Sequence, residues 1–274
     1  MRQPRRPRCG AGFDGVAVSS DDIGDRFKGY ESVFDYALPR RMPMIIRVDG
    51  RAFHGIKLAK PFDKDFFDRM ASTATALCKE IQGAMLAYFQ SDEISIVVRD
   101  DFQNTTQPWV GKRLNKVISL SAAKATAAFN KDSPYGERHF DSRAFVVPDL
   151  NEVVNYLVWR QQDATRNSVS MAAHANFSHK SLQNVGSNGM LDRLREIGSP
   201  WENTPTHFKR GAVIRSMKIL KRVEQTGEMC ERNIWEMDCE PPIFTQERGY
   251  IEGIYLAPER DTQHLSRQQQ GGGE

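Results

Sequence analysis

The chain has 274 residues, of which 39% are hydrophobic and 27% are charged, so one medium domain with additions or two small domains can bury a sizeable core. The formal net charge of +3 is too small to indicate a nucleic-acid partner by itself, so only local clusters of charge bear on that question. No apolar run approaches the roughly 18 residues of a membrane span. The four cysteines lack metal-ligand spacing, so we expect reduced thiols and a cytoplasmic location.

Both ends of the chain have the composition of flexible segments. Residues 1–20 contain arginines among proline and glycine but no apolar core of a signal peptide, which favours a disordered basic arm over a transit peptide. Residues 263–274 end in QQQGGGE, a low-complexity sequence typical of a flexible tail. Between these ends we expect a core at 21–150 and a helical and strand extension at 151–262 that packs on the core.

Hydrophobic periodicity predicts an ordered series of elements in the first half of the chain. Segments with helical spacing lie at 21–38, 63–82 and 109–129. Apolar runs with strand character lie at 44–48, 84–89, 94–99 and 140–148, and the QSDE turn joins the second and third into a hairpin. Further along we predict a helix that Asp149 or Asn151 caps, a surface loop at 187–206 around a short helix at 191–197, and added strands from Gly211 to Tyr255.

The order strand, helix, strand, strand, helix, strand matches the split βαβ, ferredoxin-like plan of an α+β protein. In this plan a helical crossover makes the first two strands parallel, and the third strand returns between them, antiparallel to both. Asp49, at the end of the first strand, and Asp92, in the turn between the second and third, then lie at the same edge of the sheet. The sequence therefore predicts that these two distant residues are neighbours.

Two carboxylates at one sheet edge repel each other unless a cation or a proton lies between them. Hard oxygen ligands suit Mg²⁺, which keeps water ligands and takes others from substrate phosphates, and Gly50 would let its carbonyl approach the ion. A structural alternative stays open, because Asp-Gly is favoured in tight hairpin turns and Asp92 also lies in a turn. Against it, Asp49-Gly50 is followed by RAFHGIKLAKPF and a helix rather than by a partner strand.

Basic residues follow both acidic turns. Lys112, Arg113 and Lys116 fall in the first two turns of the helix predicted at 109–129, where the macrodipole disfavours cations by about 0.3–1 kcal/mol each. Binding of a polyphosphate would explain this placement, and a merely solvated basic face is the alternative. His54 and Lys60 are close enough in sequence to reach the same phosphates, although a lone histidine is more often structural.

Four segments resemble motifs of one family, the tRNA-His guanylyltransferases and their relatives that add nucleotides in the 3′-to-5′ direction. They are RVDGRAFH, AYFQSDEIS, FDSRAFVVP and YLVWRQQD, and the resemblance runs from about Gly24 to Lys218. A further segment, CEPPIFTQERGYIE, is similar to the bacterial branch. The resemblance implies a polymerase-palm core with two Mg²⁺ ions, held by Asp49, the Gly50 carbonyl and Asp92, with Asp49 and Asp92 as the catalytic residues.

The same resemblance implies the binding residues and the partners. The implied nucleotide site consists of Asp49, Gly50, Arg51, Ala52, Phe53, His54, Lys60, Asp63, Ser91, Asp92, Arg113 and Lys116. Residues expected to assist RNA or substrate binding, the last two in the extension at 151–262, are Lys28, Tyr30, Glu31, Arg160 and Asn167. The implied partners are tRNA, GTP and ATP, and the implied assembly is a homotetramer built as a dimer of dimers.

One departure from the family pattern concerns tRNA reading. The eukaryotic enzymes carry His-Ile-Asn-Asn just after the WRQ-type sequence, whereas this chain has Ala164, Thr165, Arg166 and Asn167, so only the last residue matches. The difference favours the bacterial-type relatives, in which truncated tRNA 5′ ends are repaired, over strict guanylylation of tRNA-His.

The expected reaction is two-metal phosphoryl transfer, in which the 3′-hydroxyl of a nucleoside triphosphate, preferably GTP, attacks the activated 5′ phosphate of tRNA. One alternative is another palm-fold enzyme, such as a nucleotide cyclase or an ordinary polymerase. A second alternative is a non-catalytic RNA-binding module, which would stack bases on aromatic residues of the central strands.

Overall fold

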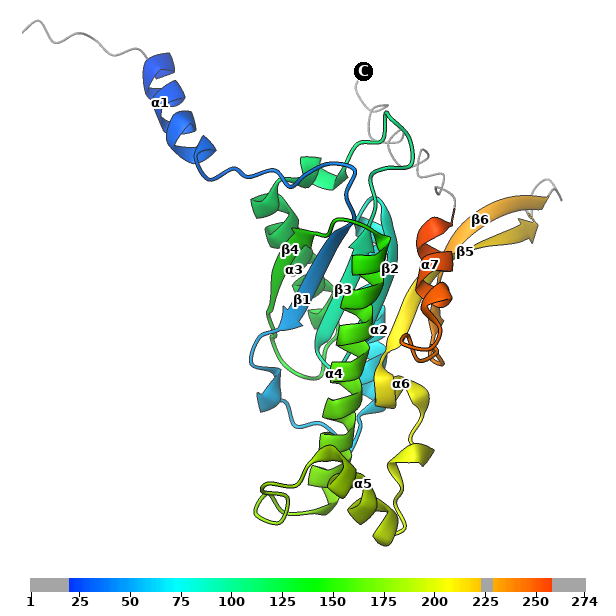
Figure 1. Ribbon diagram of the computed structural model, residues 1–274. Helices are drawn as coiled ribbons and strands as arrows, with labels where there is room; N and C mark the ends of the chain where they lie inside the picture. The colour runs from blue at the N-terminus through cyan, green and yellow to red at the C-terminus, as the bar shows by residue number, and fades with distance from the viewer. Residues whose placement is uncertain (1–19, 223–228, 258–274) are drawn as a thin grey trace, which may run out of the picture. The chain divides into compact units, whose positions relative to one another are not determined.

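Residues 20–222 and 229–257 are described by the structure, a computed structural model shown in Figure 1. The expected arm at 1–20, apart from Ser20, and the expected tail at 263–274 lie outside these residues. The chain forms two compact units, which meet in sequence between Tyr36 and Ala37. Among the described residues, no helix is both long and apolar enough to cross a membrane.

The first unit contains helix α1 (Ser20–Ser32), which is shorter than the helix predicted at 21–38. Its apolar side chains, including Phe27 and Tyr30, are exposed. Short helices in water are stable mainly when their apolar face packs against other residues. The apolar face of α1 is exposed, so no such packing extends the helix beyond Ser32.

The second unit is a mixed α+β structure around one antiparallel sheet with the strand order β4-β1-β3-β2-β5-β6. The strands are β1 (Met44–Gly50), β2 (Ala84–Gln90), β3 (Glu93–Val98), β4 (Phe140–Val146), β5 (Ala212–Arg222) and β6 (Met229–Asp238). Helix α2 (Lys64–Glu80) joins β1 to β2, and α3 (Leu114–Asn130) joins β3 to β4. Because β1 and β2 both pair antiparallel with β3, they are parallel to each other, as the sequence predicts.

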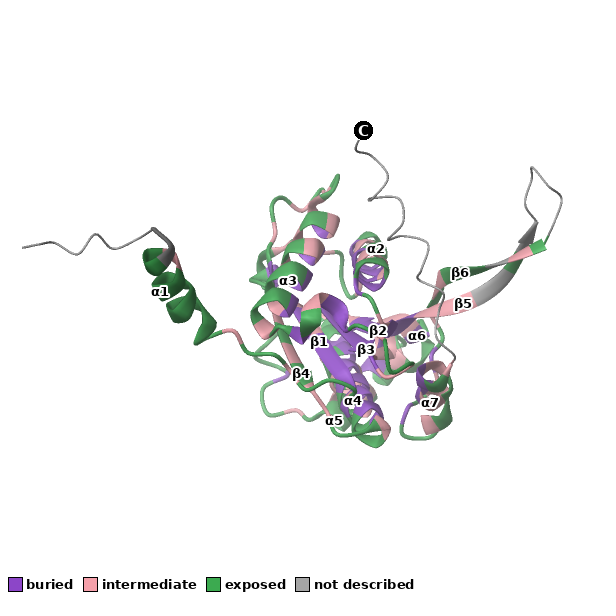
Figure 2. Ribbon diagram, turned by 90° about the horizontal axis from the view of Figure 1, so that it is seen from above, coloured by how far each residue is buried: buried purple, intermediate pink, exposed green. Residues whose placement is uncertain are grey.

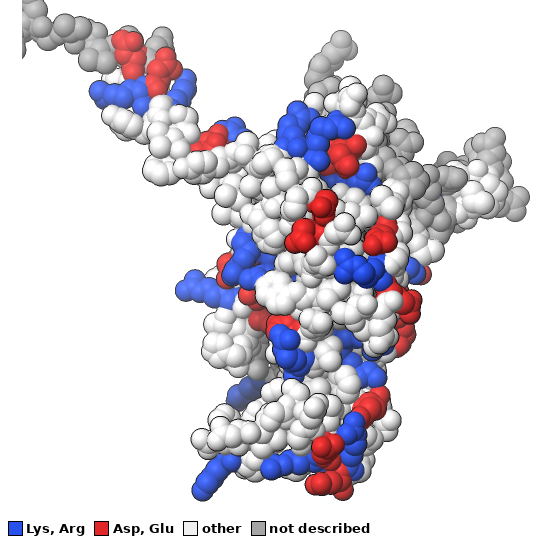
Figure 3. Space-filling view, viewed as in Figure 1, with Lys and Arg blue, Asp and Glu red and all other residues white. Residues whose placement is uncertain are grey.

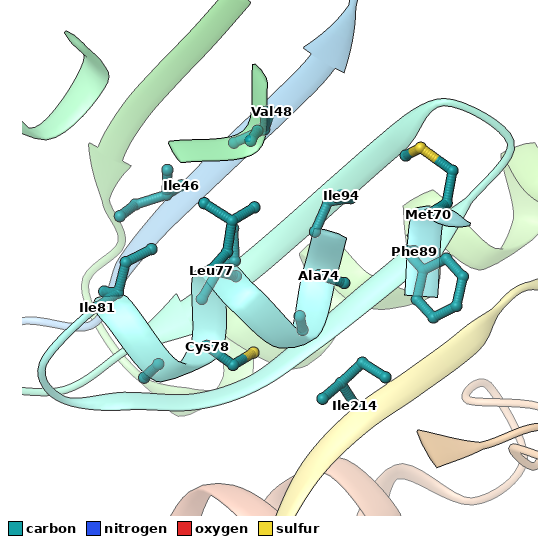
Figure 4. Close-up of a cluster of buried hydrophobic side chains, with 14 of the residues drawn as sticks. Ile46, Val48, Met70, Ala74, Leu77, Cys78, Ile81, Phe89, Ile94 and Ile214 are labelled. Carbon is teal, nitrogen blue, oxygen red and sulfur yellow. The ribbon is translucent and has the colours of Figure 1, made fainter. Parts of the chain in front are cut away.

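Helices cover both faces of the sheet, with α2 and α3 on one face and α4 (Leu150–Asn176) and α7 (Arg248–Leu256) on the other (Figure 2). Alternate strand residues fill the two cores. Ile46 and Ile94 belong to the core that contains Leu77 of α2 (Figure 4), whereas Ile45 belongs to the core that contains Leu157 of α4. Residues at even positions of β1 and β3 therefore point to α2 and α3, and those at odd positions point to α4.

The second half of the chain confirms some predictions and corrects others. Asp149 caps α4 by accepting a hydrogen bond from the Glu152 N–H, as predicted. The segment from Gly211 to Tyr255 was expected to form strands only, but after β5 and β6 it ends in α7, because Ile251 and Tyr255 are buried at helical spacing. The remaining helices are α5 (Ser187–Glu196), α6 (Thr206–Arg210) and the 3₁₀ turns η1 (Phe53–Gly55), η2 (Trp109–Lys112) and η3 (Trp201–Asn203).

Gln161 of α4 ties the segment after β6 to the rest of the second unit. Its amide nitrogen donates to the Pro242 carbonyl at 2.8 Å, and its amide oxygen accepts from the Phe244 N–H at 2.8 Å. Phe244 is fully buried and packs edge-on against Tyr88 of β2. The chain that leads to α7 is thus fixed to both α4 and the sheet.

Lys112 does not lie on an exposed basic face, contrary to the sequence-based expectation. Val110 and Gly111 have positive φ angles, so the chain kinks before α3 begins and turns Lys112 inward. The Lys112 ammonium group is 0% exposed, lies 2.8 Å from the Asp100 carboxylate, and donates to the carbonyls of Pro39 and Met42. Lys112 therefore stabilises the fold and is not available to bind phosphate.

Substitution of Lys112 by Met is expected to lower the free energy of unfolding by about 3–5 kcal/mol, because Asp100 would be left buried without its partner. Urea unfolding measures this change. The control is Lys124→Met, which breaks an exposed ion pair with Glu80 and should cost less than about 1 kcal/mol. Similar small losses for both variants would contradict the structural role of Lys112.

Candidate active site at the acidic edge of the sheet

The end of β1 and the turn between β2 and β3 lie side by side. Asp49 pairs with Glu93 in the antiparallel register of β1 and β3, and the Gly50 N–H donates to the Asp92 carbonyl at 3.0 Å. The structure thus brings Asp49 and Asp92 together at one edge, although a helix and a strand separate them in sequence.

Asp92 occupies an electrostatically unfavourable position for a carboxylate. Burial raises its pKa above the usual value, and the nearby Asp49 carboxylate raises the pKa further. The Ser91 hydroxyl, 3.2 Å from the Asp92 carboxylate, and His54 both act in the opposite direction. The pair therefore concentrates negative charge that a divalent cation would neutralise.

Gly50 is required by the close packing of this edge. A Cβ atom at position 50 would lie 2.7 Å from two ring carbons of Phe53 and 2.9 Å from the Asp92 Cβ. Phe53 is buried and contacts the rings of Phe66, Phe129 and Phe140. This aromatic cluster holds the segment after β1 in place. The neighbouring residues Arg51, Ala52 and His54 are exposed and therefore accessible to a ligand.

Asp63 and Lys60 lie in the loop that leads into α2. The Asp63 carboxylate caps α2 through the Phe66 N–H at 2.9 Å and also accepts from the Ala59 N–H at 2.8 Å. Although burial opposes the change, these two backbone hydrogen bonds lower the pKa of Asp63. Asp63 therefore shapes the loop, and Lys60 is exposed beside it.

Arg113 and Lys116 lie at the opposite end of the sheet within one chain. Arg113 bridges to Ala37, and the Leu38 N–H donates to the Lys112 carbonyl at 2.9 Å, close to where β1 begins. The acidic edge is at the other end of β1, about 17 Å away at the usual rise per strand residue. The structure thus does not bring these two basic residues to Asp49.

Arg160 makes an internal ion pair, and its part in RNA or substrate binding stays a prediction. Its guanidinium group makes two hydrogen bonds to the Glu93 carboxylate, at 2.7 and 2.8 Å, and a third to Asp163 at 3.0 Å. Asn167, one further turn along α4, is exposed. Lys28, Tyr30 and Glu31 are exposed on α1 in the first unit.

Glu93 also belongs to the candidate site, although the sequence did not single it out. It follows Asp92 directly and points to α4, where Arg160 holds it. Burial raises the pKa of Glu93, while the Arg160 guanidinium opposes that shift. Two features of the sequence could have indicated this pair: a glutamate at the start of an apolar strand and an arginine on the apolar side of a helix. Charged residues in such buried positions are seldom unpaired. The pair fixes the strand that carries Asp92.

The donor set at this edge consists of two carboxylates and backbone carbonyls. Within the described ranges, no group of three or more His, Cys, Asp or Glu side chains could hold a metal ion. Mg²⁺ does not need such a group, since it is commonly bound by one or two carboxylates together with substrate phosphates and water. The chemistry of the residues therefore fits Mg²⁺ better than a metal held entirely by protein.

Comparison with known proteins identifies the family. The protein-family model described as tRNAHis guanylyltransferase matches residues 24–148. The structure of a bacterial tRNA(His) guanylyltransferase-like protein in complex with ATP is 41% identical, covers 85% of this chain and 99% of its own, and superimposes with a TM-score of 0.75. This chain belongs to the tRNA(His) guanylyltransferase family.

Other members of the family support the same assignment. A structure of the bacterial guanylyltransferase-like protein in complex with GTP is 40% identical, with a TM-score of 0.75, and covers 86% of this chain and all of its own. A probable tRNA(His) guanylyltransferase of Mus musculus is 29% identical over 88% of this chain and 84% of its own length. The chain is accordingly a nucleotidyltransferase that acts on tRNA.

Substitution of Gly50 by Ala is expected to abolish most activity, because the added methyl group would displace Phe53 or Asp92. Nucleotide addition to tRNA measures the loss, and circular dichroism confirms that the fold persists. Gly55→Ala is the matched control, since no atom lies within 4 Å of a Cβ at that position. Full activity of the Gly50 variant would show that this edge tolerates displacement.

Substitution of Asp92 by Asn is expected to raise the melting temperature of the metal-free protein near neutral pH. Since the folded-state pKa of Asp92 is raised, ionisation of this carboxyl destabilises the fold above that pKa, and the cost disappears at lower pH where the group is protonated. Thermal melts in EDTA near neutral and at mildly acidic pH measure the difference. Glu80→Gln, at an exposed carboxylate at the end of α2 away from this edge, is the control and should change little. A lower melting temperature for the Asp92 variant would contradict the electrostatic assignment.

Proposed function

We propose that the acidic edge is the catalytic centre of a 3′-to-5′ nucleotidyltransferase, with two Mg²⁺ ions held by Asp49, the Gly50 carbonyl and Asp92. The observation that supports this proposal is the hydrogen bond from the Gly50 N–H to the Asp92 carbonyl, which keeps the two carboxylates at one edge. When bound, the metal would neutralise phosphate charge and favour ionisation of the attacking hydroxyl. The core from β1 to β4 is then a ferredoxin-like, polymerase-palm unit.

We assign the incoming nucleoside triphosphate, preferably GTP, to the exposed segment that follows β1. Arg51, Ala52 and His54 face solvent there, while the buried ring of Phe53 keeps the segment in place. Ser91, in the facing turn, and Lys60 complete the surface around the carboxylates. Asp63 contributes by holding the loop at the start of α2, and Lys28, Tyr30 and Glu31 remain predicted substrate residues.

The substrate that we propose is a tRNA whose 5′ end is to be extended, either by guanylylation of tRNA-His or by repair of a truncated end. The 3′-hydroxyl of the nucleotide attacks the activated 5′ phosphate, and pyrophosphate or AMP leaves. Ala164, Thr165 and Arg166 replace the His-Ile-Asn run of the eukaryotic enzymes, which favours repair. We assign Asn167, which is exposed on α4 within the extension at 151–262, to RNA contact.

The assembly and the compartment remain predictions. Because Arg113 and Lys116 lie far from Asp49 within one chain, a role for them in triphosphate binding requires a second chain, and this requirement is consistent with the expected homotetramer. The cytoplasmic location predicted from the cysteines is likewise a proposal.

Substitution of Asp49 or Asp92 by Asn is expected to lower the turnover number by about 10²–10³-fold, the effect of losing several kcal/mol of charge stabilisation. The assay is incorporation of labelled GTP into tRNA transcripts with an intact or a shortened 5′ end. Glu80→Gln serves as the control at an exposed carboxylate distant from this edge. Unchanged turnover in both variants would refute the metal assignment, and a cyclic nucleotide product would favour a cyclase instead.

A further inference from the structure

The half of the sheet that lies beside Asp49 has one face that helices of the second unit leave open. Phe140 and Ser142 of β4 pack against α3, whereas the alternate residues Asp141, Arg143 and Phe145 are exposed. On the same side, α4 is fixed over β3 through the hydrogen bond between Tyr156 and Ser95 and the ion pair between Arg160 and Glu93. Figure 1 shows α4 beside β1 and β4 rather than across them.

Two arginines lie next to each other on this open face. Arg47 of β1 and Arg143 of β4 are direct partners in the antiparallel register. Arg47 lies two residues before Asp49, and Arg143 lies two residues after Asp141. Alternate residues of a strand are about 7 Å apart, so the arginines lie one step from the carboxylates on the same face. Figure 3 shows Lys and Arg side chains interspersed with Asp and Glu side chains on the side of the molecule where β4 lies.

Both arginines have hydrogen-bonding capacity left for a ligand. The Nε of Arg47 is buried and has no hydrogen-bond acceptor among the described residues. Arg143 makes one contact with Asp141, at 3.4 Å between exposed side chains, which is a weak interaction. Arginine binds phosphate oxygens through two parallel hydrogen bonds, so this pair suits a phosphate backbone.

An aromatic series continues the open face away from the carboxylates. The rings of Phe145 and Tyr156 meet edge to face at 5.7 Å, and those of Tyr156 and Trp159 meet at 5.8 Å. Phe145 is 36% exposed and Trp159 is 48% exposed. The Arg160 guanidinium packs on the Trp159 ring, 4.5 Å from its centroid, and steadies it. Exposed, fixed rings beside arginines are the elements with which proteins bind single-stranded RNA.

We propose that this open face, formed by Arg47, Arg143, Phe145, Tyr156 and Trp159, binds the 5′-terminal nucleotides of the RNA substrate. The arginines contact the phosphates, and Phe145 and Trp159 stack on bases. The inference rests on the proposed function, since it places the reacting end of the RNA at Asp49 and Asp92. The two arginines of this face suit the phosphates of RNA, and the continuity of the face with the acidic edge favours RNA over a second protein chain.

The test is RNA affinity measured without nucleotide, by fluorescence anisotropy of a tRNA transcript labelled at its 3′ end. Trp159→Ala should weaken binding by about 5- to 100-fold, the range for loss of a base stacked on an aromatic ring, and Trp159→Phe should restore most of it. Arg143→Ala should weaken binding and lower the slope of log affinity against log salt by about one. GTP affinity should stay within about twofold.

Matched controls lie on the opposite face of the sheet. Lys124→Ala removes an exposed cation on α3, and Leu120→Ala removes an exposed apolar side chain of the same helix. Neither should change RNA affinity. Sedimentation of each variant shows whether the assembly is preserved.

Three results would overturn the inference. The first is unchanged RNA affinity in the Arg143 and Trp159 variants. The second is a loss of GTP affinity instead, which would make the face a nucleotide pocket. The third is dissociation of the assembly by Trp159→Ala, which would make the face a subunit interface. The proposed function fails separately, if Asp49→Asn keeps its turnover, and that result is independent of RNA affinity.

Discussion

The candidate site depends on the pairing of β1 with β3. This pairing sets Asp49 opposite Glu93 and gives the Gly50 N–H its acceptor in the turn that carries Asp92. Strand register is specified strongly wherever a sheet face is buried, and a shift by one residue would turn Asp49 toward α2 and α3. The buried Ile45 and Ile46, which belong to the cores on opposite faces of the sheet, fix the register and so fix the position of the carboxylate.

The carboxylates at the two ends of this sheet differ in whether the protein itself neutralises their charge. At the acidic edge, no ion pair joins Asp49 or Asp92 to a Lys or Arg of the described residues, whereas Glu93 beside them has Arg160. At the other end, the charge of Asp100 is matched by Lys112 inside the protein. The contrast separates carboxylates that stabilise the fold from carboxylates that retain the capacity to bind a cation.

Much of the core and of the acidic edge could be predicted from the sequence, because local periodicity and the helical crossover dictate them. The helix beginning at Asp63, the hairpin around Ser91 and Asp92, and the parallel relation of β1 and β2 follow from such patterns. Lys112 and Arg160 could not be predicted in the same way. Their burial depends on Asp100 and Glu93, residues distant in sequence, and a helical pattern does not reveal which cation will turn inward.

Gln161 connects the additions at the C-terminal end of the second unit to the acidic edge of the sheet. One side chain holds the chain at Pro242 and Phe244, and its neighbour Arg160 holds the strand that begins at Glu93. The appended region is consequently part of the framework that supports the acidic edge. Loss of the segment that Gln161 holds would remove contacts that position α4, and with α4 the Arg160 that holds the strand beginning at Glu93.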